Sequence, residues 1–337
     1  MIYLDHNATT PLRSEARKAM ELWLDLPANP MSMHRWGRDA AAAVDRARAQ
    51  VATAVGARPG QVFFTSGASE ANNWLLSEGR WAVSAVEHPS VRSRAAQILP
   101  VDRQGRCYPG EELPGITGVS VMLANNETGV LQPVEEWLAW CRARGLALHV
   151  DAAQGPGKVP VDIQADYLTL SSHKVGGPQG VGALVCRGEV PEVLIRGGPQ
   201  ERARRAGTHN VMGIVGFGAA MEAATPQNPR LRDRLEEVLV AAGGQVAGAG
   251  APRLPNTLCI HFPGVEAQDL VVALDMAGVG ISAGSACASG SPEPSSVLKA
   301  MGFSGSAVRF SLGTRTTDAE VEEAAARTLA LLPQLRD

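Results

Sequence analysis

The sequence lacks the features that would indicate a membrane protein, a secreted protein or a nucleic-acid-binding protein. No apolar run approaches the ~18 residues that suggest a membrane span. The first residues, MIYLDHNATTP, have neither the basic region nor the apolar region of a secretion signal. Lys and Arg total 31 against 34 Asp and Glu, a formal net charge of -3, which argues against a broad surface for nucleic acid. We therefore expect a cytoplasmic protein that contacts neither membrane nor nucleic acid.

Cysteine is scarce as well. The chain has five cysteines, widely scattered, and none forms a CxxC pair or another spacing typical of metal ligands. Neither disulfides nor a metal site are therefore expected. Cys186 and Cys259 lie in apolar runs typical of buried strands. Cys287 differs, because its neighbours in SAGSACASGSPEP are small residues, Gly and Pro, which predict a mobile loop.

Apolar runs alternate with helix-like or turn-rich stretches in the first half of the chain. Residues 39–55 carry apolar side chains at steps of three and four, the spacing of a helix with one buried stripe. Strands are predicted at residues 61–65, 81–86, 119–124, 146–150, 167–170 and 181–186. The alternation predicts a doubly wound α/β domain whose mainly parallel sheet is covered on both faces. Ligands of such sheets bind beyond the carboxyl ends of the strands.

The composition changes near residues 224–230, where ATPQNPR is typical of a linker. Beyond it, short strands at 258–262 and 307–310 and helical patterns at 266–276, 292–301 and 318–332 predict a smaller α+β domain. A Gly-rich stretch at 241–255 follows no strand and precedes no Lys-Ser or Lys-Thr, so we expect a loop there and no nucleotide site. We place the large domain at 12–225 and the small domain at 226–337 together with 1–11.

Polar residues follow several of the predicted strands. Residues 61–65 run into SGASEANN, where amides at a helix start could seat a phosphate, although such turns also serve for capping alone. Asp151 and Lys174 end two later strands, 174 − 151 = 23 residues apart. A carboxylate there suits a cationic ring nitrogen, and a lysine can form a Schiff base with an aldehyde cofactor. The alternative for this pair is a structural ion pair.

His88, Asn125, Asn126 and Gln154 also follow strand-like segments. An imidazole can stack on an aromatic cofactor and carry protons, while Asn and Gln amides can donate to a phenolate oxygen. Each residue alone is more often a hydrogen-bonding group of a loop. Their coincidence at successive strand ends is what favours a cofactor site.

A series of short segments carries a resemblance to a known family. The segments are YLDHNATTP, residues 28–34, FTSGASE, VEHPSV, NNETGV, HVDAAQ, SSHKVGGPQGVGAL, residues 197–208, SAGSACAS and VRFSLG. In order and spacing the chain resembles the cysteine desulfurases, class V pyridoxal phosphate enzymes, over nearly its whole length. The resemblance implies an aspartate aminotransferase-like large domain (fold type I) and pyridoxal 5'-phosphate as the cofactor.

The resemblance also implies roles for individual residues. Lys174 would carry the cofactor, Asp151 would partner its ring nitrogen, Gln154 its ring hydroxyl, and His88 would stack on the ring and move protons. Phosphate-side positions would be Ala68, Ser69, Ser171, His173 and, from the neighbouring subunit of a homodimer, Thr208. Substrate L-cysteine would be bound by Asn126 and Arg309, with Asn126 also at the cofactor. Cys287 would take the sulfur as a persulfide, leaving alanine, and pass it to an acceptor protein for iron-sulfur clusters or other thio-cofactors.

Some departures from the family pattern leave alternatives open. GGPQG at 176–180 replaces the more usual Tyr-Gly-Pro-Lys-Gly, and the chain stops at Asp337, where longer relatives carry a segment that helps dock the scaffold. Rival activities on the same scaffold are selenocysteine lysis, cysteine sulfinate breakdown and transamination, and the presence of Cys287 argues against the last. A non-catalytic sulfur-carrier partner is a further alternative, against which Lys174 and Asp151 both speak.

Overall fold

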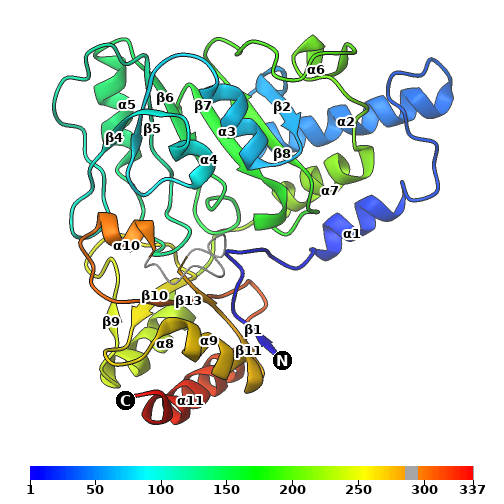
Figure 1. Ribbon diagram of the computed structural model, residues 1–337. Helices are drawn as coiled ribbons and strands as arrows, with labels where there is room; N and C mark the ends of the chain where they lie inside the picture. The colour runs from blue at the N-terminus through cyan, green and yellow to red at the C-terminus, as the bar shows by residue number, and fades with distance from the viewer. Residues whose placement is uncertain (285–294, 337) are drawn as a thin grey trace.

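The computed structural model describes residues 1–284 and 295–336, which form a larger and a smaller unit (Figure 1). The larger unit is built on a seven-stranded sheet. Its strands are β2 (Val62–Thr65), β3 (Trp81–Ser84), β4 (Ala95–Leu99), β5 (Gly118–Ser120), β6 (Ala147–Asp151), β7 (Tyr167–Ser171) and β8 (Gly182–Cys186). They lie in the order β2-β8-β7-β6-β5-β3-β4, and only β8 runs antiparallel to its neighbours. The carboxyl ends of the other six therefore meet at one edge.

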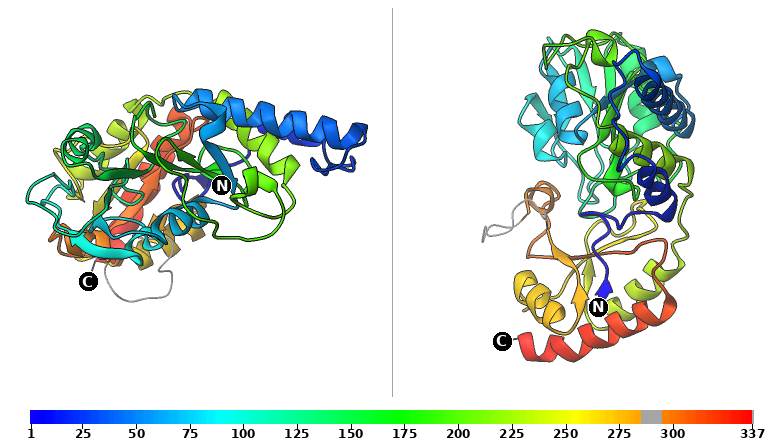
Figure 2. Two further views of the ribbon diagram at one scale, coloured as in Figure 1. Left: turned by 90° about the horizontal axis from the view of Figure 1, so that it is seen from above. Right: turned by 90° about the vertical axis from the view of Figure 1, so that its right-hand side faces the viewer.

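Helices cover both faces of this sheet (Figure 2). One face carries α1 (Ser14–Glu21), α2 (Arg35–Ala54), α5 (Val134–Arg142) and α7 (Val211–Glu222). The other carries α3 (Ala68–Leu76) and the short α4 (Pro89–Arg92). Two consecutive residues of β2 point to opposite faces and show why both faces are buried. Phe64 packs in the core under α2 and α7. Phe63 packs on Trp74 of α3 at a ring-centroid distance of 5.7 Å.

The smaller unit has its own core around an antiparallel sheet. The sheet contains β9 (Gln245–Val246), β10 (Thr257–His261), β12 (Ser282–Ala283) and β13 (Val308–Ser311), and its helices are α8 (Arg230–Ala241), α9 (Ala267–Met276), α10 (Ser296–Ala300) and α11 (Asp318–Leu335). At the N-terminus, β1 (Ile2–Tyr3) pairs in parallel with β11 (Val279–Gly280). The first residues thus pack with the smaller unit before the chain crosses to the larger one, which is why we propose the domain division 12–225 and 226–337 with 1–11.

The structure confirms the predicted α/β class with its mainly parallel sheet. Several predicted bounds differ from it. The strand expected at 81–86 ends at Ser84, and of the helix expected at 292–301 the described part is α10 (Ser296–Ala300). The helix expected at 39–55 begins at Arg35 and ends at Ala54. The strand expected at 119–124 is assigned only as β5, although Val121 and Leu123 still donate backbone hydrogen bonds to His149 and Asp151. Helix α7 was not predicted, because it carries apolar residues and glycines on all its faces and so shows no amphipathic period.

In the described ranges, no helix has the length and apolar character needed to cross a membrane. The remaining short elements are two turns of 3-10 helix, η1 (Pro59–Gln61) and η2 (Ser172–Lys174), and the turn α6 (Gln200–Ala203). The turn η2 follows β7 directly and carries Lys174. Turn α6 precedes Thr208.

Candidate active site

A cavity of about 550 Å³ lies at the carboxyl ends of the parallel strands. It is lined by Ser66, Gly67, Ala68, Ser69, Glu70 and Asn72 after β2, His88 after β3, Met122, Ala124 and Asn126 after β5, Asp151, Ala153 and Gln154 at β6, Ser171, His173 and Lys174 at β7, and Gln179, Gly180 and Val181 before β8. The smaller unit contributes Arg309 from β13, and the N-terminal segment contributes Asn7 and Ala8.

Most residues singled out from the sequence line this cavity. They are Ala68, Ser69, His88, Asn126, Asp151, Gln154, Ser171, His173, Lys174 and Arg309. Thr208 does not line it and is exposed on the segment after α6. Cys287 lies outside the described residues. Asn125 is buried in the turn after β5, where its side-chain Oδ1 accepts from the amides of Glu127 and Thr128, so its role is local.

Asp151 is held in one orientation by hydrogen bonds. Its carboxylate accepts from the side chain of Asn72 at 2.8 Å and from the amide of Ala153 at 3.0 Å, and the residue is 6% exposed. Asn72 donates its other hydrogen to the hydroxyl of Ser90 at 3.0 Å, and that hydroxyl lies 2.8 Å from Nδ1 of His88. A carboxylate this buried requires such donors.

His88 is fixed at the start of α4. The amide of Ser90 donates to its Nδ1 at 3.2 Å, so Nδ1 is an acceptor and the hydrogen of the neutral ring is on Nε2. Burial lowers the pKa of His88, opposed by the charge of Asp151 and reinforced by that of Lys174. The ring is therefore neutral at pH 7, and its Nε2 carries a hydrogen that it can donate.

Lys174 reaches back to the N-terminal segment. Its ammonium donates to the carbonyl oxygens of Asn7 and, at 2.8 Å, Ala8. The neighbouring His173 lies 3.1 Å from the hydroxyl of Thr9, and burial together with the charge of Lys174 lowers its pKa to about 4. The lysine thus sits between the sheet edge and residues that pack with the smaller unit.

The turn after β2 places backbone amides at the cavity wall. Helix α3 begins after Gly67, which has no side chain to cap the helix. The first amides of the helix therefore remain available to an anion. Strand β8 passes so close that a Cβ on Gly182 would lie 2.6 Å from the carbonyl carbon of Gly67. Glycine at 182 is what allows this approach.

Arg309 is almost completely buried, with 1% of its surface exposed. One terminal nitrogen pairs with Asp5 at 2.6 Å and the other donates to the carbonyl of Asn126 at 2.9 Å. Its Nε has no hydrogen-bond partner among residues 1–284 and 295–336. A buried guanidinium with a donor to spare suits a carboxylate ligand.

Sequence reasoning missed several residues of the site. Asn72 lay within a segment that the sequence singled out, but nothing local indicated its contact with Asp151. Glu87 is buried beneath Met122, and burial followed by the charge of Asp151 raises its pKa well above the usual value. Lys158 gave no signal beyond its place four residues after Gln154, to which it donates a hydrogen bond.

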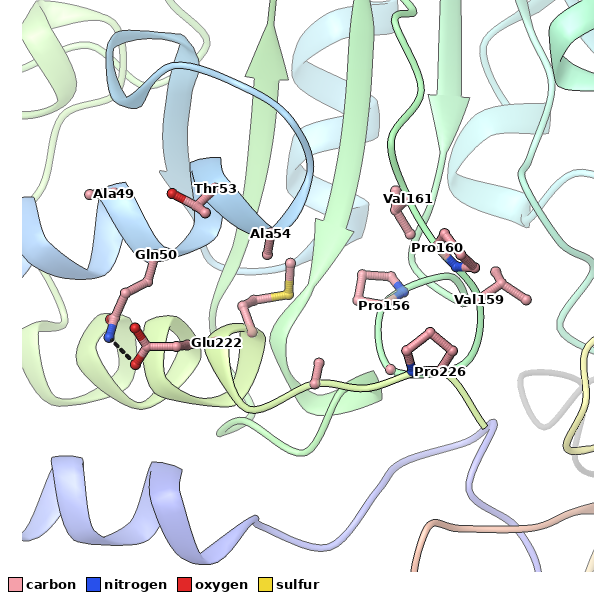
Figure 3. Close-up of a pocket in the computed structure, with 13 residues that line it drawn as sticks. Ala49, Gln50, Thr53, Ala54, Pro156, Val159, Pro160, Val161, Glu222 and Pro226 are labelled. Atoms are coloured by element: carbon pink, nitrogen blue, oxygen red, sulfur yellow. Dashed lines mark hydrogen bonds between the residues drawn. The ribbon is translucent and has the colours of Figure 1, made fainter. Parts of the chain in front are cut away.

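A second cavity of about 490 Å³ lies between α2, α7 and the turn at residues 156–161 (Figure 3). Its one carboxylate, Glu222, already accepts a hydrogen bond from Gln50 at 2.8 Å. None of the residues predicted from the sequence lines it. No cluster of three or more His, Cys, Asp or Glu in the described part of the chain is arranged to hold a metal.

The family described as aminotransferase class-V matches residues 2–323 of this chain. A protein of Cereibacter sphaeroides named cysteine desulfurase is 40% identical, covering 100% of this chain and 96% of the relative. The chain belongs to the cysteine desulfurases of the class-V aminotransferase family. A solved NifS-like protein from Rickettsia africae superposes with a TM-score of 0.90 at 31% identity, covering 99% of both chains. A structure titled SspA in complex with cysteine superposes with a TM-score of 0.82 at 29% identity, covering 93% of this chain and 99% of that one.

The cavity fits pyridoxal phosphate in the chemistry of its walls. A buried carboxylate, Asp151, stands at one side, and the amides that open α3 offer an anion seat at another. Lys174 supplies an amine and His88 a neutral ring on the same cavity. These are the groups required by a cofactor with a ring nitrogen, a phosphate and an aldehyde.

Proposed function

We propose that this enzyme removes sulfur from L-cysteine with pyridoxal phosphate held on Lys174 and captures the sulfur on Cys287. The observation that carries the proposal is the meeting of Lys174, Asp151, His88 and Arg309 in one cavity, from four separate elements. The structure titled with bound cysteine supports the choice of substrate. An ion pair at the strand ends would need only two of these groups.

The bound cofactor would supply an electron sink for the carbon whose proton is removed. Asp151 would keep a positive charge at the ring nitrogen, and the amides at Ala68 and Ser69 would hold the phosphate. Lys174 would carry the proton taken from the α-carbon of the amino acid. Ser171 and His173 would close the phosphate side, with Gln154 donating to the ring hydroxyl.

His88 and Arg309 would act on the substrate. The guanidinium would bind the α-carboxylate, with Asn126 beside it. His88 would donate its Nε2 hydrogen to a group of the substrate and take a proton back at the same nitrogen. Because burial already lowers the pKa of His88, the neutral ring is the resting form.

The sulfur atom would then be transferred from the substrate to Cys287. The thiolate of Cys287 would attack the substrate sulfur, the carbon-sulfur bond would break, and its electron pair would stay on the carbon that becomes the methyl group of alanine. Both borders of the segment that carries Cys287 lie near the site: a Cβ on Gly284 would lie 3.5 Å from Cβ of Ser295, and Ser295 donates to Glu127, next to Asn126.

The test combines a spectrum with product analysis. The purified protein should absorb near ~420 nm, the band of lysine-bound pyridoxal, and should form alanine and, with a reductant, sulfide from cysteine. Cys287→Ala should keep the band and lose sulfide release, whereas Cys141→Ala, which removes a buried thiol of α5, should keep both. Sulfide release by Cys287→Ala at the wild-type rate would instead indicate a lyase, including a selenocysteine lyase. Absence of the band in wild type would overturn the role of Lys174.

We also propose a homodimer in which Thr208 reaches the partner's cofactor. Thr208 is exposed and outside its own cavity. The connection from α1 to α2 exposes large apolar side chains, among them Met33 at 90%, and the first turn of α2 exposes Trp36 at 55%. Mixing Lys174→Ala with Thr208→Ala subunits should restore one intact site per mixed dimer. If Thr208 served its own subunit, mixing would restore nothing.

A sulfur-acceptor protein and a cytoplasmic location complete the proposal. A persulfide on Cys287 has to be cleared before the next turnover, and an acceptor thiol of another protein would do this without release of free sulfide. Incubation with radiolabelled cysteine and candidate acceptors should move label from Cys287 to the acceptor. Cell fractionation would test the location.

A further inference from the structure

Lys158 is a buried lysine for which the proposed reaction has no use. It is 3% exposed and lies on the turn after β6, four residues beyond Gln154. Its ammonium donates to Oε1 of Gln154, and among the described residues this is its hydrogen-bond partner. Lys158 and Lys174 both line one small cavity, which has Lys174 in common with the main cavity. Burying an ammonium is costly, so a group with a single neutral acceptor calls for an explanation.

The backbone around Lys158 is held in one conformation. Its amide donates to the carbonyl of Gly155 at 3.0 Å, and its carbonyl accepts from the amide of Gln227 at 3.1 Å. A Cβ on Gly155 would lie 2.6 Å from Leu123, so the turn packs directly on the sheet. Pro156, Val159 and Pro160 flank the turn (Figure 3). Lys158 is therefore directed at Gln154 by a rigid support.

The hydrogen bond from Lys158 decides which way the amide of Gln154 faces. Oε1 accepts from Lys158, and Nε2 donates one hydrogen to the carbonyl of Asn7 at 3.0 Å. A reversed amide would set an NH₂ group against the ammonium and an oxygen against a carbonyl oxygen. The orientation is thus fixed from both ends. The second Nε2 hydrogen has no partner among the described residues, and Gln154 lines the main cavity.

We infer that Lys158 is a positioning residue that fixes Gln154 with its N–H group toward the cofactor's ring oxygen. The inference rests on the proposed function, because it concerns how the chain holds pyridoxal phosphate. This role explains why the position holds a buried amine: an apolar side chain of similar length could not donate a hydrogen bond to Gln154. The same carbonyl of Asn7 also accepts from Lys174, so the Lys158–Gln154 pair and Lys174 share one anchor.

The effect of the charge of Lys158 on the site has to be distinguished from the effect of its hydrogen bond to Gln154. Burial lowers the pKa of Lys158 well below its usual value, and the charges of Lys174 and Arg309 lower it further. Lys158 in turn lowers the pKa of His6 and His173. Removing Lys158 would therefore act on the site both by releasing Gln154 and by removing any charge.

A double-mutant cycle on the holoenzyme separates the two. The measured quantity is the pKa of the lysine-bound chromophore, from absorbance against pH, in wild type, Lys158→Met, Gln154→Ala and the double variant, with the exposed Lys18→Met as control. A donor to the ring oxygen favours its ionised form, so we expect Lys158→Met to raise this pKa by about one unit, a tenfold change in proton affinity. In the Gln154→Ala background the same substitution should change it by less than a third of that.

Each outcome decides the inference. An undiminished shift in the Gln154→Ala background, or no shift in Lys158→Met, would overturn positioning in favour of a charge effect or a packing role. A parallel cycle on the free energy of unfolding of the cofactor-free protein should show that the Lys158–Gln154 coupling exists without the cofactor. If wild type forms no chromophore, the proposed function fails, and the unfolding cycle then decides on its own: a coupling indistinguishable from zero overturns the inference.

Discussion

Replacing Glu201 by Gln is expected to destabilise the protein by about 3 kcal/mol, the loss that follows when a buried ion pair loses one partner. Glu201 is 4% exposed and accepts two hydrogen bonds from Arg48 at 2.7 Å, one from His209 at 2.8 Å and one from the amide of Phe64 at 2.9 Å. Gln retains the shape but leaves the guanidinium of Arg48 without its counter-charge.

The pKa of Glu201 reflects the same contacts and leads to a similar magnitude. Burial raises this pKa, but the hydrogen bonds from Arg48 and His209 outweigh burial and lower it to about 2. Against ~4.3 for an unfolded glutamate, the difference corresponds to ~3 kcal/mol at about 1.4 kcal/mol per unit. Because the folded pKa is the lower one, this contribution is complete above pH ~4.3 and is lost as the pH falls toward 2.

The stabilisation has a structural purpose at this position. Glu201, Arg202 and Ala203 all adopt left-handed backbone conformations, with φ of 46°, 57° and 59°. Each costs roughly 1 kcal/mol or more for a residue other than glycine. The bonds to Glu201 hold this strained turn in place, and the turn leads directly to Thr208.

Urea unfolding of the cofactor-free protein at pH 7 and at pH 3 would measure the effect, at fixed protein concentration because a dimer would couple association to stability. Glu21→Gln is the matched control, since Glu21 pairs with Arg17 on the surface with 54% of its side chain exposed and should cost less than ~1 kcal/mol. A loss below ~1 kcal/mol for Glu201→Gln, or the same loss at both pH values, would refute the reasoning.

Three further substitutions test the site. Asp151→Asn should keep the ~420 nm band but lower the rate of alanine formation by at least ~10²-fold, measured at saturating cysteine, because the counter-charge of the ring nitrogen is lost. Arg309→Lys should raise KM for cysteine ~10-fold or more with the band unchanged, since one ammonium cannot replace a forked donor. Gly182→Ala should weaken cofactor binding in spectral titration and destabilise the fold by ~1–3 kcal/mol, because its Cβ would meet Gly67 at 2.6 Å.

The strand ends could be predicted because their signal is local. Asp151 and Lys174 close apolar runs, and parallel strands bring their carboxyl ends to one edge, so a shared cleft follows from the pattern alone. Family resemblance was needed for Arg309, which reads as an ordinary strand residue until its burial and its contact with Asp5 are known. The contact joins residues 304 positions apart.

The parts that could not be predicted depend on such distant contacts. Lysine is usually a surface residue, yet the turn after β6 buries Lys158. Glu201 lies in a run of arginines that indicates a solvated segment, and only the fold brings Arg48 of α2 to it. In both cases the pairing partner is selected by tertiary packing, which leaves no period or motif in the sequence.

The N-terminal segment links the two ends of the chemistry. Asn7 and Ala8 accept hydrogen bonds from Lys174. Asp5, two residues before Asn7 in the same segment, pairs with Arg309. Because a guanidinium has five N–H donors, Arg309 can bind a carboxylate through Nε and a remaining terminal hydrogen while Asp5 stays in place. The lysine that would hold the cofactor and the arginine that would hold the substrate are thus set against one short stretch of backbone. Their separation is therefore fixed by the N-terminal segment rather than by the packing of the two units alone.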